Sequence, residues 1–276
     1  MTSWDLAAIA AVLLIGVPHG GLDGAVARRI GWPTGLLAWF GFNVGYSVLT
    51  VLVVVLWWQW PVLGLAIFLA LSALHFGRSD IASTQSVITE TSGLQMLPLL
   101  AHAGLVSIAI PNLQASAVLP VFTLLVGDDG ALMLLQALDI LFIPWLCCVA
   151  AYGVYGVIYP VWRMPLLNLV VLLVFMALLP PLVSFALYFC LWHSRSHMLR
   201  VWHSLSDDQE RRRSFIEAAL YTLIAWITML LMLVVFQESF SAALIQLTFI
   251  GLAALTVPHM LLVDLAEKIN LRRLLR

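Results

Sequence analysis

Long apolar stretches with almost no charge follow one another along this 276-residue sequence, and they constrain its fold more than any other feature. A helix needs about 20 apolar residues to cross the hydrocarbon core of a bilayer, where a chain must satisfy its own backbone groups. The pattern predicts an all-α fold, a polytopic membrane helical bundle of about nine transmembrane helices, with eight to ten compatible. We place the nine stretches at residues 6–27, 34–57, 61–79, 93–112, 131–158, 164–179, 182–202, 215–236 and 241–264.

Residues 1–276 are expected to form a single integral-membrane domain, because no internal repeat and no linker rich in Ser, Gly or Pro divides them. The Lys and Arg residues form groups that each follow an odd-numbered stretch, which favours a cytoplasmic C-terminus. Residues 113–130 contain an apolar run too short to span, so we expect an external loop with an interfacial or re-entrant piece. No basic tract is interleaved with aromatic residues, which excludes nucleic acid as a partner.

Histidines within the apolar stretches are the strongest functional signal. His193 and His197 are four residues apart, so on a helix both rings lie on one face and can reach one ion, which is half of a metal site. Polar side chains in lipid usually face the bundle interior or a functional cavity, although they also form hydrogen bonds between helices without any metal. The predicted topology places six of the seven histidines at similar depth in the cytoplasmic half: His19, His75, His102, His193, His197 and His259.

The residues around His19 support it as a ligand. Asp23 follows one helical turn later, where it can accept the N–H of the second ring nitrogen and hold the tautomer, while Pro18 and Gly20-Gly21 loosen the helix. Several neutral imidazoles with no thiolate suit iron, zinc, copper or nickel, and spacing alone does not choose among them.

His75 and His259 each precede an acidic residue by five positions, Asp80 and Asp264 respectively. That spacing lies off the histidine's face on a regular helix. The two acids are therefore either accessory residues of the site or interfacial charges.

Six motifs distributed from the first stretch to the last closely resemble the Brp/Blh family of membrane β-carotene 15,15'-dioxygenases. Together they are specific, although Pro-His-Gly alone is a weak signal. They are Gly16-Val17-Pro18-His19-Gly20, His75-Phe76-Gly77, Ala101-His102-Ala103-Gly104, Pro180-Pro181-Leu182-Val183-Ser184-Phe185, Trp192-His193-Ser194-Arg195-Ser196-His197 and residues 249–260 ending in Pro258-His259-Met260.

The resemblance implies an iron(II) enzyme that cleaves the central double bond of β-carotene with O2 to give two molecules of all-trans-retinal, typically for a microbial rhodopsin. It implies a bacterial or archaeal cell membrane and a lipid environment. The implied iron ligands are His19, His75, His193 and His197. His102 and His259 lie in motifs shared with the family but are not carried over as ligands, and we name them, with Asp23 and Arg195, as accessory residues. The sequence has Ser196 where family members have a second basic residue, so any role of that group falls to Arg195.

A carotenoid dissolves in the bilayer and is about as long as its core is thick, so an enzyme built of membrane helices can admit it laterally. Aromatic residues within a few turns of the proposed ligands are candidates for lining a substrate tunnel, although aromatic packing between helices explains them equally well. They are Phe68, Phe76, Phe185, Tyr188, Phe189 and Trp192.

Three other functions share some of these features. A retinal-binding pump needs a lysine within a span for its Schiff base, and Lys268, the only lysine, lies beyond the last stretch. A transporter or a haem-binding membrane protein would use the histidines for cargo or as axial ligands. A carotenoid-binding or retinal-binding factor would keep the fold without catalysis.

Overall fold

The computed structural model describes residues 1–85, 93–205, 207–235 and 239–274, with side chains described as far as residue 266. Every regular element in this described part is a helix, which confirms the all-α prediction. The elements are α1 (Ser3–Ala11), η1 (Val12–Gly16), η2 (Val17–Leu22), α2 (Asp23–Arg29), α3 (Leu36–Gln59), α4 (Pro61–Gln85), η3 (Gly93–Gln95), α5 (Met96–Gly104), η4 (Leu105–Ala109), α6 (Ile110–Leu113), α7 (Ala115–Val126), α8 (Asp128–Ile158), η5 (Pro160–Trp162), α9 (Arg163–Leu178), α10 (Pro181–Ala186), η6 (Leu187–Ser194), α11 (Arg195–His203), α12 (Asp208–Val235) and α13 (Phe240–Leu274).

Eight helical segments among the described residues are long and apolar enough to cross a membrane, at the low end of the predicted eight to ten. Their side chains are also distributed as lipid requires, because large apolar residues such as Leu37, Ile140 and Val234 are 85%, 74% and 86% exposed. The chain is therefore a polytopic membrane protein. The eight segments are Ser3–Arg29, Leu36–Gln59, Pro61–Gln85, Gly93–Leu113, Asp128–Ile158, Pro160–Leu178, Asp208–Val235 and Phe240–Ala266.

Two regions of the sequence, residues 182–202 and 113–130, lie outside these eight membrane-spanning segments or only overlap their ends. The stretch 182–202 is helical through α10, η6 and α11, but it is not among the eight, because its second half is rich in His, Ser and Arg. Residues 113–130, expected to be an external loop with an interfacial or re-entrant piece, form the end of α6, the helix α7 and the start of α8. Helix α7 is apolar but has only 12 residues, and Gly127, with φ +79°, forms the turn that precedes α8.

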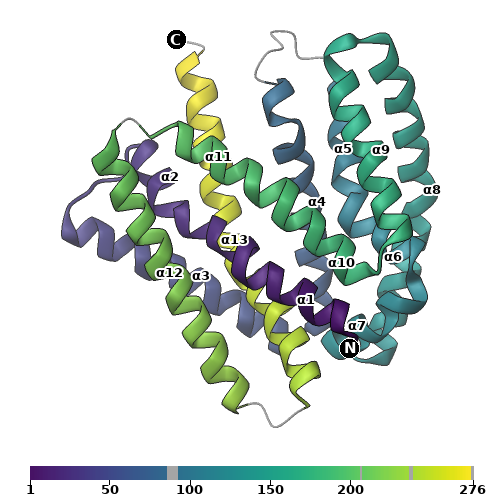
Figure 1. The fold of residues 1–276 in the computed structure, drawn as a ribbon, viewed down its shortest axis with the longest axis horizontal. Coiled ribbons are helices and arrows are strands. Elements are labelled where there is room, and N and C mark those ends of the chain that lie inside the picture. Colours follow the sequence, from purple (N-terminus) through teal and green to yellow (C-terminus); the bar gives the residue numbers. More distant parts are fainter. Residues whose placement is uncertain (86–92, 206, 236–238, 275–276) are drawn as a thin grey trace. The chain divides into compact units, whose positions relative to one another are not determined.

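The helices divide into two compact units, each assembled from two separate parts of the sequence. The first comprises Met1–Ala8 and Val62–Phe189, and in it α5, α8 and α9 pack against one another while α7 packs on α8 (Figure 1). Gly77 lets α4 approach α5, since a Cβ there would lie 2.6 Å from the Leu99 carbonyl oxygen. The prediction that residues 1–276 form a single integral-membrane domain stays a prediction.

The second unit comprises Ile9–Pro61 and Cys190–Arg276. Helix α13 packs against α3 and α2 (Figure 1). Helix α12 packs against η2. Helix α2 ends in a Schellman motif, in which Gly31 at φ +93° lets the Trp32 N–H donate to the Ala27 carbonyl oxygen. One apolar core of this unit combines η2, α2, α11, the turn after α11 and α13. Its buried residues are Leu22, Ala25, Val26, Ala27, Val201, Leu205 and Leu262.

Candidate metal centre

His19 lies where the first membrane segment departs from α-helical geometry. The π-helical segment η1 leads into the 3-10 segment η2, which carries Pro18, His19 and Gly20-Gly21, so the expected loosening of the helix is confirmed. The His19 Nδ1 lies 2.5 Å from the Gly16 carbonyl oxygen. Because a carbonyl only accepts, Nδ1 carries the proton and Nε2 carries the lone pair, the form in which imidazole binds a metal.

His193 and His197 lie on consecutive elements of one continuous helical segment, His193 in the π-helical η6 and His197 in α11. Both rings lie edge-on to His19, with ring centroids 5.4 and 5.7 Å from its centroid. Ser194 lies between them in sequence, and its Oγ is 3.2 Å from the His19 Nδ1. The spacing of four residues thus places both histidines beside His19, as the predicted metal site requires.

A fourth imidazole, that of His259 on α13, lies in the same cluster. Its ring centroid is 5.1 Å from those of both His19 and His197. With metal–nitrogen bonds of about 2.1 Å and a centroid about 1 Å behind each nitrogen, two imidazoles on one ion have centroids about 5 Å apart. The rings in this cluster are therefore close enough to share an ion.

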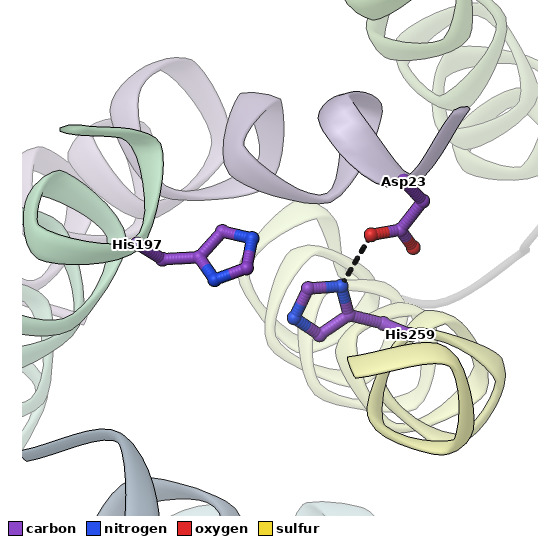
Figure 2. A group of neighbouring side chains, drawn as sticks. All are labelled: Asp23, His197 and His259. Carbon is purple, nitrogen blue, oxygen red and sulfur yellow. Dashed lines mark hydrogen bonds and ion pairs between the residues drawn. The ribbon is translucent and has the colours of Figure 1, made fainter. Parts of the chain in front are cut away.

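Asp23, the first residue of α2, holds the ring of His259 (Figure 2). The Oδ1 of Asp23 accepts a hydrogen bond from the His259 Nδ1 at 2.7 Å, and its Oδ2 accepts one from the Tyr46 hydroxyl at 2.9 Å. Asp23, His197 and His259 can each offer one ligand atom, and these three atoms lie within 4.8 Å of one another. All three side chains are buried, so water screens the electrostatic interaction of the Asp23 carboxylate with the two imidazoles only weakly.

This arrangement corrects the expected pairing of Asp23 with His19. The Asp23 carboxylate serves His259 and Tyr46, while the His19 Nδ1 donates to the Gly16 carbonyl. The reason is local: the 3-10 geometry of η2 removes the regular turn that would have placed Asp23 above His19.

Tyr46 on α3 was not foreseen as part of this cluster. It is one of a few polar residues, with Asn43, Ser47 and Thr50, in the mainly apolar stretch 34–57, and that is the signal that sequence offered. Its partner on α2 is 23 residues away in sequence, a distance that no helical periodicity predicts.

The first unit contains the other two predicted histidines. His75, on α4, is buried, with its ring centroid 5.9 Å from that of Phe76. His102, on α5, has its Nδ1 3.3 Å from the Asp80 Oδ2, and the Tyr188 hydroxyl donates to the same oxygen at 3.0 Å. Asp80 therefore belongs to a buried network with His102 and Tyr188, and it is not an interfacial charge.

Four of the predicted tunnel residues, all in this unit, form one aromatic cluster. Phe185 and Phe189 are stacked with centroids 5.4 Å apart, and Phe76 lies 5.2 Å from Tyr188 and 6.4 Å from Phe189. All four side chains are buried. This arrangement is what both the tunnel and the helix-packing interpretations require, so the tunnel stays a prediction.

Three further residues named from sequence are Phe68, Trp192 and Arg195. Phe68 on α4 and Trp192 in η6 are half-buried. Arg195, the first residue of α11, is exposed, and its accessory role stays a prediction.

The donor set of the second unit fits a transition-metal ion of intermediate softness. It offers four buried imidazoles, those of His19, His193, His197 and His259, whose exposed fractions are 8%, 1%, 5% and 3%. One carboxylate, that of Asp23, supports the cluster. Imidazole with carboxylate is the ligand chemistry of nonhaem iron and of zinc.

Comparison with known proteins places the chain in a family. The profile of the family described as "Beta-carotene 15,15'-dioxygenase" matches residues 10–267. A protein of that name from the uncultured marine bacterium 66A03 is 33% identical over 273 residues, covering 94% of this chain and 93% of the relative. A "Probable beta-carotene 15,15'-dioxygenase Blh" from Halobacterium salinarum is 26% identical over 207 residues, 70% of this chain and 60% of the relative. No solved structure matches. The resemblance found in the sequence motifs is confirmed, and the chain belongs to the beta-carotene 15,15'-dioxygenase family.

Proposed function

We propose that this chain is an iron(II)-dependent dioxygenase that cleaves the central double bond of β-carotene with O2 and releases two molecules of all-trans-retinal. The observation that carries the proposal is the buried imidazole cluster in a membrane protein of this family, with His19 Nε2 and His259 Nε2 set as lone-pair nitrogens by their hydrogen bonds. In the reaction one carbon–carbon double bond breaks and each carbon gains one oxygen atom. No other reactant is needed for balance.

The proposed metal site comprises His19, His193 and His197, with His75 as the further ligand that the resemblance implies. Bound iron(II) supplies the activation of O2 that an apolar polyene cannot provide by itself. The protein's part is to hold the ligands rigidly, and the hydrogen bonds of His19 to Gly16 and Ser194 support this. Burial of the rings excludes water that would compete for the metal and for the substrate.

The substrate is proposed to enter from lipid and to be held by apolar contact alone. β-Carotene offers no hydrogen-bonding group, so shape and aromatic surface must determine which bond reaches the metal. The aromatic cluster of Phe76, Phe185, Tyr188 and Phe189 suits such a surface because its rings are packed in fixed orientations. These residues would set the register of the polyene.

We also propose a plasma-membrane location with the C-terminus in the cytoplasm, from the distribution of basic residues along the sequence. Part of that pattern, the side chains of residues 267–276, lies outside the described residues. Retinal released into the bilayer would be available to a microbial rhodopsin, which is the proposed use of the product.

Expression in bacteria that accumulate β-carotene tests the activity. The orange colour should fade while retinal appears in the extract, whereas cells with an empty vector should keep their colour. A binding factor would retain carotenoid without forming an aldehyde, and a haem protein would show a Soret band after purification. Either result, without retinal, would contradict the proposal.

The purified, detergent-solubilised protein tests the iron and the oxygen. Metal-depleted protein should form no retinal until iron(II) is added, and zinc(II) should not replace it because zinc has no redox chemistry. With isotopically labelled O2, both aldehydes should carry the label when exchange with water is prevented. Label in only half of the retinal formed would exclude a dioxygenase.

A further inference from the structure

We infer that His259 is itself a ligand of the metal, and that Asp23 and Tyr46 are the positioning residues that hold its ring. This inference rests on the proposed metal-dependent function and extends it to a residue that the sequence analysis names only as accessory. It also gives a role to a tyrosine that the sequence motifs do not include.

The position of the His259 ring is the first support. Its centroid is 5.1 Å from those of both His19 and His197, which is shorter than the 5.4 and 5.7 Å that separate His19 from His193 and His197. Ligand atoms of His197, His259 and Asp23 also lie within 4.8 Å of one another, so the His259 ring is as well placed to share an ion with His197 as the His19 ring is.

The tautomer of His259 is the second support. A carboxylate only accepts, so the 2.7 Å contact with the Asp23 Oδ1 places the proton on the His259 Nδ1 and the lone pair on Nε2. Histidines that bind metals almost always donate their other N–H to a carboxylate, a carbonyl or water. The His19 ring has the same arrangement, with the Gly16 carbonyl in place of the carboxylate.

Asp23 is held in turn by α3. The Tyr46 hydroxyl donates to the Asp23 Oδ2 at 2.9 Å and also lies 3.3 Å from the Leu255 carbonyl oxygen, one turn before His259 on α13. Tyr46 thus links three helices of the second unit at the point where His259 enters the cluster. Because both carboxylate oxygens of Asp23 already accept hydrogen bonds, we assign this residue to holding His259 and not to binding the metal.

The test uses the purified full chain, depleted of metal and titrated with cobalt(II), whose absorption bands report the ligand set. His259→Ala should weaken cobalt(II) binding by about 100-fold or more, and Asp23→Asn by about 10–100-fold, the range for residues that support a ligand. X-ray absorption of the cobalt-loaded protein should count one fewer imidazole in His259→Ala and an unchanged number in Asp23→Asn. Tyr46→Phe should weaken binding less than Asp23→Asn, without changing the imidazole count.

His203→Ala is the matched control, because His203 is exposed at the end of α11, and it should bind cobalt(II) like the unmodified chain. His259→Gln, which keeps a polar side chain, serves if His259→Ala does not fold. An unchanged imidazole count and affinity in a folded His259 variant would overturn the inference. Loss of an oxygen ligand in Asp23→Asn would overturn the role assigned to Asp23 and make it a direct ligand.

The two proposals can fail separately. If the protein forms retinal but His259 variants keep full metal affinity, the proposed function stands and this inference fails. If the metal requires His259 but no retinal forms from β-carotene, the inference stands and the proposed function fails.

Discussion

A Cβ placed on Gly21 would lie 2.8 Å from both the Cα and the carbonyl oxygen of Ala218, so η2 passes directly against the backbone of α12. Real Cβ atoms do not approach backbone so closely, and backbone cannot rotate away as a side chain can. Gly21 therefore fixes how closely the segment that carries His19 can pack against its neighbour. No added methyl group can be accommodated there without moving one of the two helices.

Gly21→Ala should consequently displace η2 and lower both the stability and the metal affinity of the protein. Overpacking of this kind costs about 1–3 kcal/mol, and a shift of His19 disturbs the ligand geometry as well. Gly20→Ala is the matched control, because a Cβ at Gly20 has nothing within 4 Å. Cobalt(II) titration and unfolding in denaturing detergent measure both effects. Equal behaviour of the two variants would show that the close approach has no consequence.

Tyr188→Phe should destabilise the first unit by about 1.5–3 kcal/mol, the range for a hydrogen bond to a charged group. The lost hydroxyl leaves a buried Asp80 carboxylate with one fewer donor, while the contact of Asp80 with His102 remains. Tyr159→Phe is the control, because Tyr159 is 47% exposed, and its effect should stay within about 0.5 kcal/mol. Thermal unfolding of the two purified proteins is the measurement. A Tyr188→Phe variant as stable as its control would show that Asp80 does not need that donor.

Arg28→Lys should also destabilise the protein, although the charge is kept. The Arg28 guanidinium donates to the Glu217 carboxylate at 2.6 Å and to the Ser214 hydroxyl at 2.9 Å, and it lies 5.5 Å from the Trp39 ring. An ammonium group cannot make all three contacts, because it lacks the planar fork, so a loss of about 1–3 kcal/mol is expected.

Arg213→Lys provides the comparison, because Arg213 contacts the same Glu217 carboxylate at 2.9 Å but is 45% exposed. Ion pairs in that setting contribute little to stability and are screened by salt. Unfolding in denaturing detergent at low and at high salt should therefore separate the two variants. A larger loss of stability in Arg213→Lys than in Arg28→Lys would contradict the structural role assigned to Arg28.

Sequence predicted those features that depend on hydropathy or on helical spacing. A membrane-crossing helix must be apolar over about 20 residues, so eight of the nine predicted stretches coincide with long apolar helices. Pro18 and Gly20-Gly21 marked the break in the helix at His19. The spacing of His193 and His197 placed both beside one partner because four residues make about one turn.

Sequence did not predict the contacts that depend on which helices are neighbours. Asp23 and His259 are 236 residues apart, and nothing in either motif indicates that the carboxylate serves this imidazole instead of His19. Asp80 was considered as an accessory residue of His75, its neighbour in sequence, yet it contacts His102 on another helix. The π-helical geometry of η6 was likewise not foreseen, because the hydrophobic pattern does not distinguish one extra residue in a turn.

His75 gives the last prediction, because its role as a ligand comes from the resemblance alone. It is buried on α4, and His75→Leu replaces the ring with an apolar group of similar size, so folding should be kept while metal affinity falls. Removal of one of several imidazoles should weaken cobalt(II) binding by about 100-fold or more, beyond the 10–100-fold loss typical of a supporting residue. Ser72→Ala is the control, because Ser72 is buried one turn earlier on the same helix, and its cobalt(II) affinity should be unchanged. If His75→Leu binds cobalt(II) as tightly as Ser72→Ala, His75 is not a ligand, and the four imidazoles of the second unit form the site.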